Sequence, residues 1–411
     1  MLPVPFRYAA AAALTFALAL SACKVEPVQP IEDAPQTVQP ATVAADPGLA
    51  LRLPTSNSPV PGDEGAFYMR VEQDTVHGLR QFGWEAGQYG FVRDVVRTPV
   101  GRTFNRLHEG LDIAPLGRDA NGEPLDTVRA AYDGVVAYTF KSGASAFGRH
   151  LVVEHDWGAG PVYTLYAHLN EVLVSEGDTV AAEAPIGRLG YTGRFINRAR
   201  AHVHFEVDLL INGDIDAWLA RHYGRAVPHG RFFGTNLAGL NPTELLEAAQ
   251  APDFDFVRYV RSLPVGYRVA VPGDRPLDLL NRYPWMRTDR PQAKTPTPAA
   301  DTARAFVTRA DSLAIPDTAG RPAPTPATSD IQGGTGAWEV AFTQAGVPIG
   351  ARRIAREVTR PTVTYVAPEI RDGYLSTNQM LVRRGDGYQV SSPRGMRYFG
   401  LLTTTPQSAP W

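Results

Sequence analysis

The chain has 411 residues, of which 44% are hydrophobic and 20% are charged, and its formal net charge is −2. This length allows two or three domains, and the near-balanced charge without a basic tract argues against nucleic acid as a partner. The single cysteine, Cys23, excludes an internal disulfide.

Residues 1–22 have the features of a cleaved signal peptide. One basic residue, Arg7, precedes an alanine- and leucine-rich run from Ala9 to Leu20, which has the length of a signal-peptide core and is too short for a membrane span. The run ends in Leu-Ser-Ala-Cys23, which resembles a bacterial lipobox. The resemblance implies that Cys23 is lipidated and becomes the new N-terminus. The alternative is a plain secretory signal with a chance cysteine.

The residue after Cys23 bears on which membrane would hold the anchor. It is Lys24, whereas Gram-negative lipoproteins that stay in the inner membrane have aspartate at this place. We therefore expect a protein of the cell envelope, lipid-anchored through Cys23 at the periplasmic face of the outer membrane. Several acyl chains would be needed, because a single chain binds a membrane only marginally.

Residues 23–65 and 66–97 differ in composition. The first stretch is dense in Pro, Ala, Thr, Val and Ser without periodicity, which predicts a disordered tether. The second is an N-terminal extension that contains several aromatic residues, and packing is the default expectation for them. A further hypothesis is that the extension completes a groove wall or covers the functional site. These aromatic residues are Phe67, Tyr68, Phe82, Trp84, Tyr89 and Phe91.

Residues 98–249 contain short β-rich runs separated by glycine turns. This pattern predicts an all-β, antiparallel sandwich or barrel-like core instead of alternating βαβ units. Near the end, Asn241 is suited to cap a helix that has Pro242 at its first position. The predicted strands span 127–131, 134–140, 150–155, 162–168, 179–180, 186–189 and 201–210.

The rest of the chain divides into three segments. A helix-like run followed by prolines predicts a helical connector over 250–290, and a Pro/Thr-rich stretch predicts a linker over 291–335. The pattern of residues 336–411 predicts a small β-rich domain, in which we recognise no motif. This domain can bind the cell wall, a partner protein or nothing. Its alternating runs span 338–343, 362–366, 379–382 and 398–402.

Three separated segments carry side chains suited to zinc chemistry. They contain His108 with Asp112, His168, and the pair His202 and His204. A catalytic zinc usually takes three protein ligands and leaves one position for water; His108, Asp112 and His204 supply such a set. The imidazoles of His202 and His204 share one face of a strand because side chains alternate. Each motif alone occurs by chance, and the prediction depends on their combination.

The order of these motifs and the glycine turns around them closely resemble the M23 family of LytM-like metalloendopeptidases. The turn segments are 131–136, 176–180 and 186–193, and the resemblance covers about residues 98–212. It implies a LytM-like fold, Zn²⁺ held by His108, Asp112 and His204, and cleavage of peptide cross-links or stem peptides in peptidoglycan. It also implies that His202 is the general base and that His168 stabilises the oxyanion or assists protonation.

The chain departs from the family pattern in three places, which leaves its specificity open. Residues 194–201 are bulky and cationic where the family has a short link of small residues, and 117–126 and 214–239 look like insertions. The arginines at 194, 198 and 200 can bind carboxylates of stem peptides or phosphates of the wall, or they can belong to a solvated loop. The remaining histidines, His77, His150, His155, His222 and His229, are expected to be structural.

Parts of the sequence also fit two other functions. The first is a catalytically silent LytM-like lipoprotein that binds and activates a cell-wall amidase, which would make an envelope protein the partner. Such regulators have typically lost ligands, and here none is missing. The second is a lipoyl- or biotinyl-like carrier, suggested by the turn at Gly177–Val180. A carrier needs a lysine at its hairpin tip, and the chain has none between Lys141 and Lys294.

Overall fold

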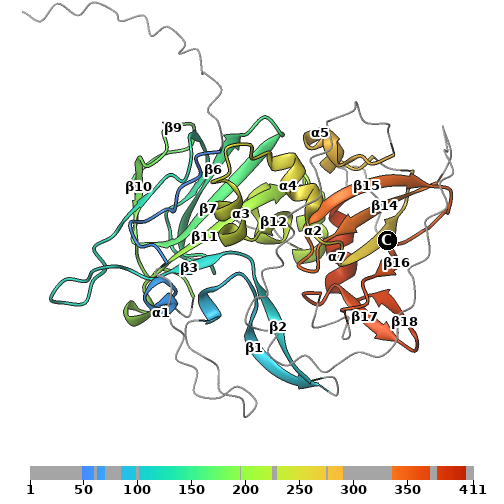
Figure 1. Cartoon of the computed structure of the whole chain (residues 1–411), viewed down its shortest axis with the longest axis horizontal. Helices are drawn as coiled ribbons and strands as arrows, with labels where there is room; N and C mark the ends of the chain where they lie inside the picture. Colours follow the sequence, from blue (N-terminus) through green and yellow to red (C-terminus); the bar gives the residue numbers. More distant parts are fainter. Residues whose placement is uncertain are drawn as a thin grey trace, which may run out of the picture. The chain divides into compact units, whose positions relative to one another are not determined.

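The computed structural model describes residues 49–59, 63–69, 85–98, 101–194, 196–224, 229–274, 276–289, 336–370 and 377–403, with the backbone alone for 64, 85, 91–98 and 101–106. All of them belong to one compact unit, Asp46–Trp411 (Figure 1). The predicted signal peptide, Cys23, His77 and the whole linker over 291–335 lie outside the described residues. Within the described part, no helix has the length and hydropathy that a membrane span requires.

The largest sheet contains seven antiparallel strands in the order β12-β11-β7-β6-β5-β9, with β3 also paired to β11. Along β11, Val203, Phe205, Val207 and Leu209 are fully buried in the main core, while the residues between them point to the opposite face. The strands are β3 (Leu111–Ile113), β5 (Gly134–Phe140), β6 (Arg149–Asp156), β7 (Pro161–Leu169), β9 (Thr179–Val180), β11 (Val203–Leu210) and β12 (Leu237–Leu240).

A three-stranded sheet provides further residues of the same core. It consists of β4 (Thr127–Arg129), β10 (Pro185–Arg188) and β8 (Glu171–Val172), and its buried Val128 and Ile186 belong to one hydrophobic cluster with Tyr166 and Phe205. The predicted all-β, antiparallel core is confirmed. Because β12 and β9 end the main sheet without pairing to each other, the sheet is open and no barrel closes.

The prediction of a disordered tether is wrong for residues 49–59. Leu51 is buried, the Arg52 amide donates to the Ala131 carbonyl (2.8 Å), and the Arg129 amide donates to the Pro54 carbonyl (2.8 Å). The Asn57 side chain donates to the carbonyls of Ala66 and Ala114. A proline-rich composition does not reveal this docking, because the partners lie far away along the chain.

The N-terminal extension contains α1 (Glu64–Phe67), η1 (Glu85–Gly87) and β1 (Gly90–Thr98), and β1 forms a hairpin with β2 (Gly101–His108). The helix predicted after Asn241 is present as α3 (Pro242–Ala248), and the Asn241 side chain accepts from the Thr243 amide. The remaining short helices before the linker are η2 (Arg198–Arg200), α2 (Asp216–Tyr223), η3 (Gly230–Phe232), η4 (Gly234–Asn236), α4 (Phe256–Ser262), α5 (Leu279–Arg282) and η5 (Pro284–Met286).

The predicted helical connector also contains a strand, so that prediction is wrong in one part. β13 (Tyr267–Val271) lies between β14 (Ala337–Phe342) and β16 (Thr362–Val366) in a four-stranded sheet with the order β15-β14-β13-β16. β15 spans Pro348–Ile354. The pairing joins residues on opposite sides of the linker over 291–335, which local periodicity cannot indicate.

The run 398–402 is also wrong as a strand, because it lies mostly in helix α7 (Arg394–Leu401). Tyr398, Phe399, Leu401 and Leu402 are all buried, and a short apolar run of this kind fits a buried helix as well as a strand. The two-stranded sheet of β17 (Leu381–Arg384) and β18 (Gly387–Val390) precedes α7.

Side chains from the first part of the chain bind the last helix directly. The Asn212 amide donates to the Leu401 carbonyl (2.7 Å), and the Trp218 indole donates to the Arg397 carbonyl (2.9 Å). In the connector, the buried Tyr283 hydroxyl accepts from the Leu210 amide and donates to the Pro161 carbonyl. The C-terminal sheet and α7 are therefore held against the elements that carry the functional site.

Candidate metal centre

Strand register places two of the predicted ligands side by side. In the antiparallel pair of β3 and β11, Asp112 is directly opposite His204, and opposite residues on one face have their Cβ atoms about 5 Å apart. The Asp112 Oδ1 atom lies 2.8 Å from His204 Nδ1. The sheet itself therefore brings together residues that are 92 positions apart in sequence.

His108 reaches the same point from the end of β2. The chain then crosses β11 at Gly110, where a Cβ would lie 2.3 Å from the Phe205 carbonyl oxygen, so only glycine fits. The Nε2 atom of His108 lies 2.9 Å from Asp112 Oδ1 and 3.1 Å from His204 Nδ1. Within the described residues, His108, Asp112 and His204 form the only group of three with the spacing of metal ligands.

The hydrogen bonds around this cluster leave three acceptor atoms facing one another. His108 Nδ1 donates to the Gln88 carbonyl (2.6 Å) and His204 Nε2 donates to Glu206 Oε1 (2.5 Å). The inward nitrogens of the two neutral rings therefore carry lone pairs, and they converge with a carboxylate oxygen. Such a set requires a cation or a proton between its members. Tetrahedral zinc places its ligand atoms about 3.3 Å apart, which this set approaches.

The local charges favour a positive charge at the same position. Burial opposes the charged form of His204, but Glu206 and Asp112 outweigh it and raise the pKa of His204 to about 10. A metal ion that binds here replaces this proton, because metal ligands must be deprotonated. The donor set and its electrostatics therefore fit a divalent metal ion.

His202 and His168 lie beside the cluster, and the centroids of their rings are 4.7 Å apart. His202 Nδ1 donates to the Arg200 carbonyl (2.6 Å), and its Nε2 lies 3.5 Å from Asp112 Oδ1. His168 Nδ1 donates to the Thr192 carbonyl (2.8 Å). Each ring consequently has an unprotonated Nε2 when neutral, which is the atom that a general base uses.

The backbone of His168 adopts φ +61°, a left-handed conformation that is uncommon outside glycine. Its ring is accommodated by Gly193, where a Cβ would lie 3.1 Å from His168 Nδ1. Burial lowers the pKa of His168 well below 6.5, and the neighbouring His202 and His204 lower it further. The ring is therefore neutral at physiological pH and is able to accept a proton.

All five predicted side chains are buried, from 1% exposed for His108, Asp112 and His202 to 5% for His204 and 8% for His168. The N-terminal extension contributes to this environment. Gln88 orients His108, and the Met69 amide donates to the Asp112 carbonyl (2.8 Å). The extension thus supports the ligand-bearing strand, and the hypothesis that it covers the site stays a prediction.

Three residues near the cluster were missed in the sequence: Gln88, Glu206 and Asp208. Glu206 and Asp208 follow His202 and His204 with period two, so alternation alone places them on the same face of β11. Asp208 is fully buried, and neither of its carboxylate oxygens has a hydrogen-bond partner among the described residues. Burial and the neighbouring Glu206 raise the pKa of Asp208 well above its usual range. Gln88 acts through its backbone and leaves no sequence signal.

The Glu206→Gln variant should bind zinc about 10- to 100-fold more weakly, as is usual when a carboxylate that orients a ligating histidine is lost. The reason is that Glu206 fixes the His204 tautomer through the 2.5 Å hydrogen bond to Nε2. Competition with a chromophoric chelator measures the affinity. The exposed Glu369→Gln variant is the control, and equal affinities for both variants would contradict this role.

His150 and His155 lie outside the cluster, as expected, and both are buried. Their Nδ1 atoms donate to the carbonyls of Gly148 and Asp133. Burial lowers the pKa of each to about 4, whereas an unfolded histidine titrates near 6.5. Both therefore belong to the hydrophobic interior and not to the metal centre.

These two histidines should make the fold acid-sensitive. A depressed pKa contributes stability that is present above pH 6.5 and is lost as the pH falls toward 4, because the unfolded state then binds more protons. Urea unfolding should show a loss of a few kcal/mol across this window. His155→Gln should reduce the pH dependence of the unfolding free energy more than His222→Gln does, because the side chain of His222 is only partly buried. An unfolding free energy that is constant from pH 7 to 5 would contradict the argument.

Side-chain contacts hold part of the arginine-rich loop over 194–201 in place. Arg198 pairs with Glu123 (3.4 Å), and the Arg118 side chain donates to the Arg198 carbonyl (2.8 Å). The Asn197 side chain caps η2 by accepting from the Arg200 amide. Two segments that depart from the family pattern, 117–126 and 194–201, therefore contact each other.

One family model matches the segment that contains this cluster. Residues 106–215, which contain all five predicted site residues, match the model of peptidase family M23, so the predicted resemblance is confirmed for this segment. A search of curated proteins gave no match.

Solved structures give matches of low TM-score. One is a zinc-containing peptidase from Vibrio cholerae, with 25% identity over 39% of this chain and TM-score 0.23; this chain spans 37% of its length. Another is a catalytic domain of the prophage-encoded M23 protein EnpA from Enterococcus faecalis, with 24% identity, 30% and 86% of the two chains covered, and TM-score 0.21. A third is the catalytic domain of lysostaphin from Staphylococcus simulans, with 20% identity, 40% and 96% covered, and TM-score 0.25.

Proposed function

We propose that the chain is a zinc-dependent endopeptidase of the bacterial cell envelope that hydrolyses peptide bonds in peptidoglycan cross-links or stem peptides. The convergence of His108, Asp112 and His204, with two further histidines alongside, carries the proposal. The M23 match over residues 106–215 supports it.

In this proposal His108 Nε2, Asp112 Oδ1 and His204 Nδ1 hold Zn²⁺. When bound, the ion supplies a Lewis acid for the amide carbonyl and lowers the pKa of water. His202 accepts a proton from the attacking water at Nε2, because its Nδ1 is already committed to the Arg200 carbonyl. His202 can later return this proton to the leaving amine.

For His168, the hydrogen bonds favour one of the two predicted roles. A neutral ring that donates from Nδ1 to the Thr192 carbonyl has no second proton with which to stabilise an oxyanion. We therefore assign His168 to proton transfer; it becomes a donor to the oxyanion only after it has accepted a proton.

We also propose that Cys23 carries the lipid anchor, which the lipobox-like end of the leader supports, and that the anchor lies at the periplasmic face of the outer membrane, which Lys24 supports. Metabolic labelling with a tritiated fatty acid should mark the wild-type protein, and Cys23→Ser should remove the label. A labelled Cys23→Ser protein would contradict the anchor.

Digestion of purified sacculi tests the hydrolase. The zinc-loaded protein should release fragments with new amine termini, which mass spectrometry identifies. A chelator should stop the release and added zinc should restore it. If the loaded protein releases nothing but accelerates a purified cell-wall amidase on the same sacculi, the catalytically silent alternative is correct and the hydrolase proposal is wrong.

A further inference from the structure

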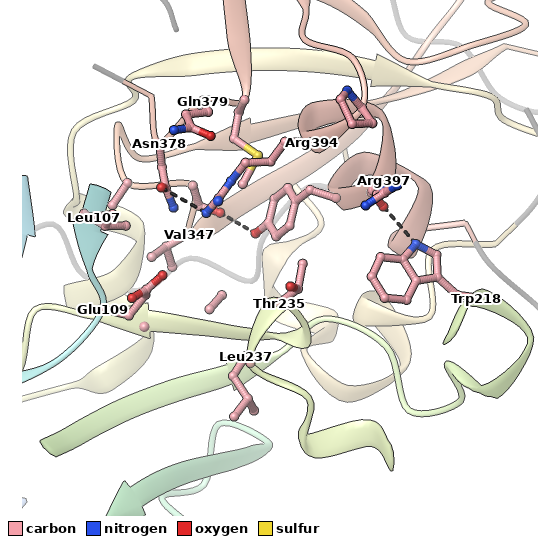
Figure 2. A pocket seen from close by; sticks show the side chains of 18 of the residues that line it. Leu107, Glu109, Trp218, Thr235, Leu237, Val347, Asn378, Gln379, Arg394 and Arg397 are labelled. Carbon is pink, nitrogen blue, oxygen red and sulfur yellow. Dashed lines mark hydrogen bonds between the residues drawn. The ribbon is translucent and has the colours of Figure 1, made fainter. Parts of the chain in front are cut away.

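A pocket lies between the first part of the chain and the C-terminal elements (Figure 2). Of its lining residues, only Leu107 and Glu109 belong to the segment that matches the family model. Its volume is about 390 Å³, which is in the range of pockets for small molecules. One wall comes from the end of β2, α2 and β12, and the other from the turn before β15, the segment before β17, and α7.

The pocket is continuous with the peptide that carries a predicted metal ligand. Glu109, which lines it, directly follows His108. Glu109 also packs on β12, because a Cβ on Gly239 would lie 2.4 Å from the Glu109 carbonyl oxygen. The pocket and the metal centre therefore share one short stretch of backbone.

An acidic and a basic side chain face each other across this pocket. Glu109 projects from one wall and Arg394 from the other (Figure 2). Within the described residues no ion pair joins the two side chains. A gap between a carboxylate and a guanidinium is complementary to a molecule that carries an ammonium and a carboxylate group.

The cationic side of the pocket is preorganised. Asn378 Oδ1 accepts from Arg394 Nη2 at 3.0 Å, and Asn378 is itself buried. The turn that presents it has left-handed backbone at Asn378 (φ +50°) and Gln379 (φ +64°), and the Ser391 hydroxyl donates to the Gln379 carbonyl. A guanidinium held in this way loses little freedom when it binds a carboxylate with two parallel hydrogen bonds.

Apolar groups, including Leu237, Val347 and the ring of Tyr398, also line the pocket. The Tyr398 hydroxyl is already used, since it donates to the Gly346 carbonyl. The lining suits the carbon chain of an amino acid, and the volume is sufficient for one or two residues.

We propose that this pocket binds an amino acid or the end of a short peptide that carries both an ammonium and a carboxylate group. Glu109 binds the ammonium, and Arg394 binds the carboxylate. The identification of the bound group as part of a peptidoglycan peptide rests on the proposed function. The binding of an ammonium and a carboxylate in this pocket does not rest on it.

Isothermal titration calorimetry of the full-length protein in excess chelator tests the pocket, with alanyl-alanine as the probe. The chelator removes metal, so the probe cannot bind through zinc and cannot be cut. We expect alanyl-alanine to bind at least tenfold more tightly than its N-acetyl form and its C-terminal amide, because each loses one charged contact.

Two pocket variants test which wall binds the ammonium group and which wall binds the carboxylate group. Glu109→Gln should bind the free and N-acetylated dipeptides equally, and Arg394→Gln should bind the free dipeptide and its amide equally. The matched controls are Glu369→Gln and Arg383→Gln, both exposed and in the C-terminal part. Circular dichroism verifies that each variant folds.

Several results would overturn the proposal: no measurable binding to the wild-type protein, blocked dipeptides that bind within twofold of the free one, or controls that lose as much as the pocket variants. Failure of the proposed function is distinguishable, since a protein that binds the dipeptide in chelator yet releases nothing from sacculi when zinc-loaded keeps the pocket and loses the hydrolase.

Discussion

Asp112→Ala is expected to abolish stoichiometric zinc binding and the release of fragments from sacculi. Asp112 Oδ1 lies 2.9 Å from His108 Nε2 and 2.8 Å from His204 Nδ1, and it is the only anionic oxygen of the three-residue cluster. Without it, two buried imidazoles would have to hold a divalent cation with no anionic ligand, which low dielectric makes costly. Metal analysis after dialysis against substoichiometric chelator measures the zinc content.

The control for this prediction is Asp386→Ala, an exposed carboxylate in the β17–β18 turn. It should retain one zinc per chain and full activity. Asp112→Ala that keeps zinc with wild-type affinity would show that the ligand set is wrong, whatever its activity.

His202→Ala should retain zinc and lose about 10²- to 10⁴-fold in the rate of fragment release, the usual contribution of a general base. Its Nε2 is 3.5 Å from Asp112 Oδ1, farther than either predicted ligand nitrogen. Loss of this ring should therefore affect proton transfer and leave the three ligands in place. Initial rates and zinc content are measured on the same preparation.

His222→Ala is the matched control, because His222 lies on α2 away from the five site residues. Partial recovery of His202→Ala by added imidazole would support a proton-transfer role. Loss of zinc from His202→Ala would make His202 a ligand, and an unchanged rate would remove it from the mechanism.

Several strands could be predicted because their signals are local. β5, β9 and β16 coincide with predicted runs, since alternation and glycine turns depend on neighbours in sequence. The pairing of Asp112 with His204 depends on the β3–β11 register, which no local pattern gives, and the expectation that they converge came from the family resemblance.

The errors also have a common physical cause. Leu51 and Asn57 dock on surfaces formed by distant residues, and β13 pairs with strands beyond the linker. The apolar run of α7 is too short for its period to be read. Glu206 was within reach of the sequence, because it continues the period-two series of His202 and His204.

The position of β13 in the C-terminal sheet determines how the fold responds to proteolysis or truncation of the chain. β13 pairs with β14 on one edge and with β16 on the other. A protease nick between residues 291 and 335 would leave two fragments clamped by backbone hydrogen bonds, so they should co-migrate under native conditions. A truncated chain ending at 290 would lack β14 and β16, so both edges of β13 would have unpaired backbone groups. Unpaired strand edges pair with other chains and cause aggregation. If the segment that matches the family model is expressed without the C-terminal sheet, the expressed chain should therefore end before Tyr267.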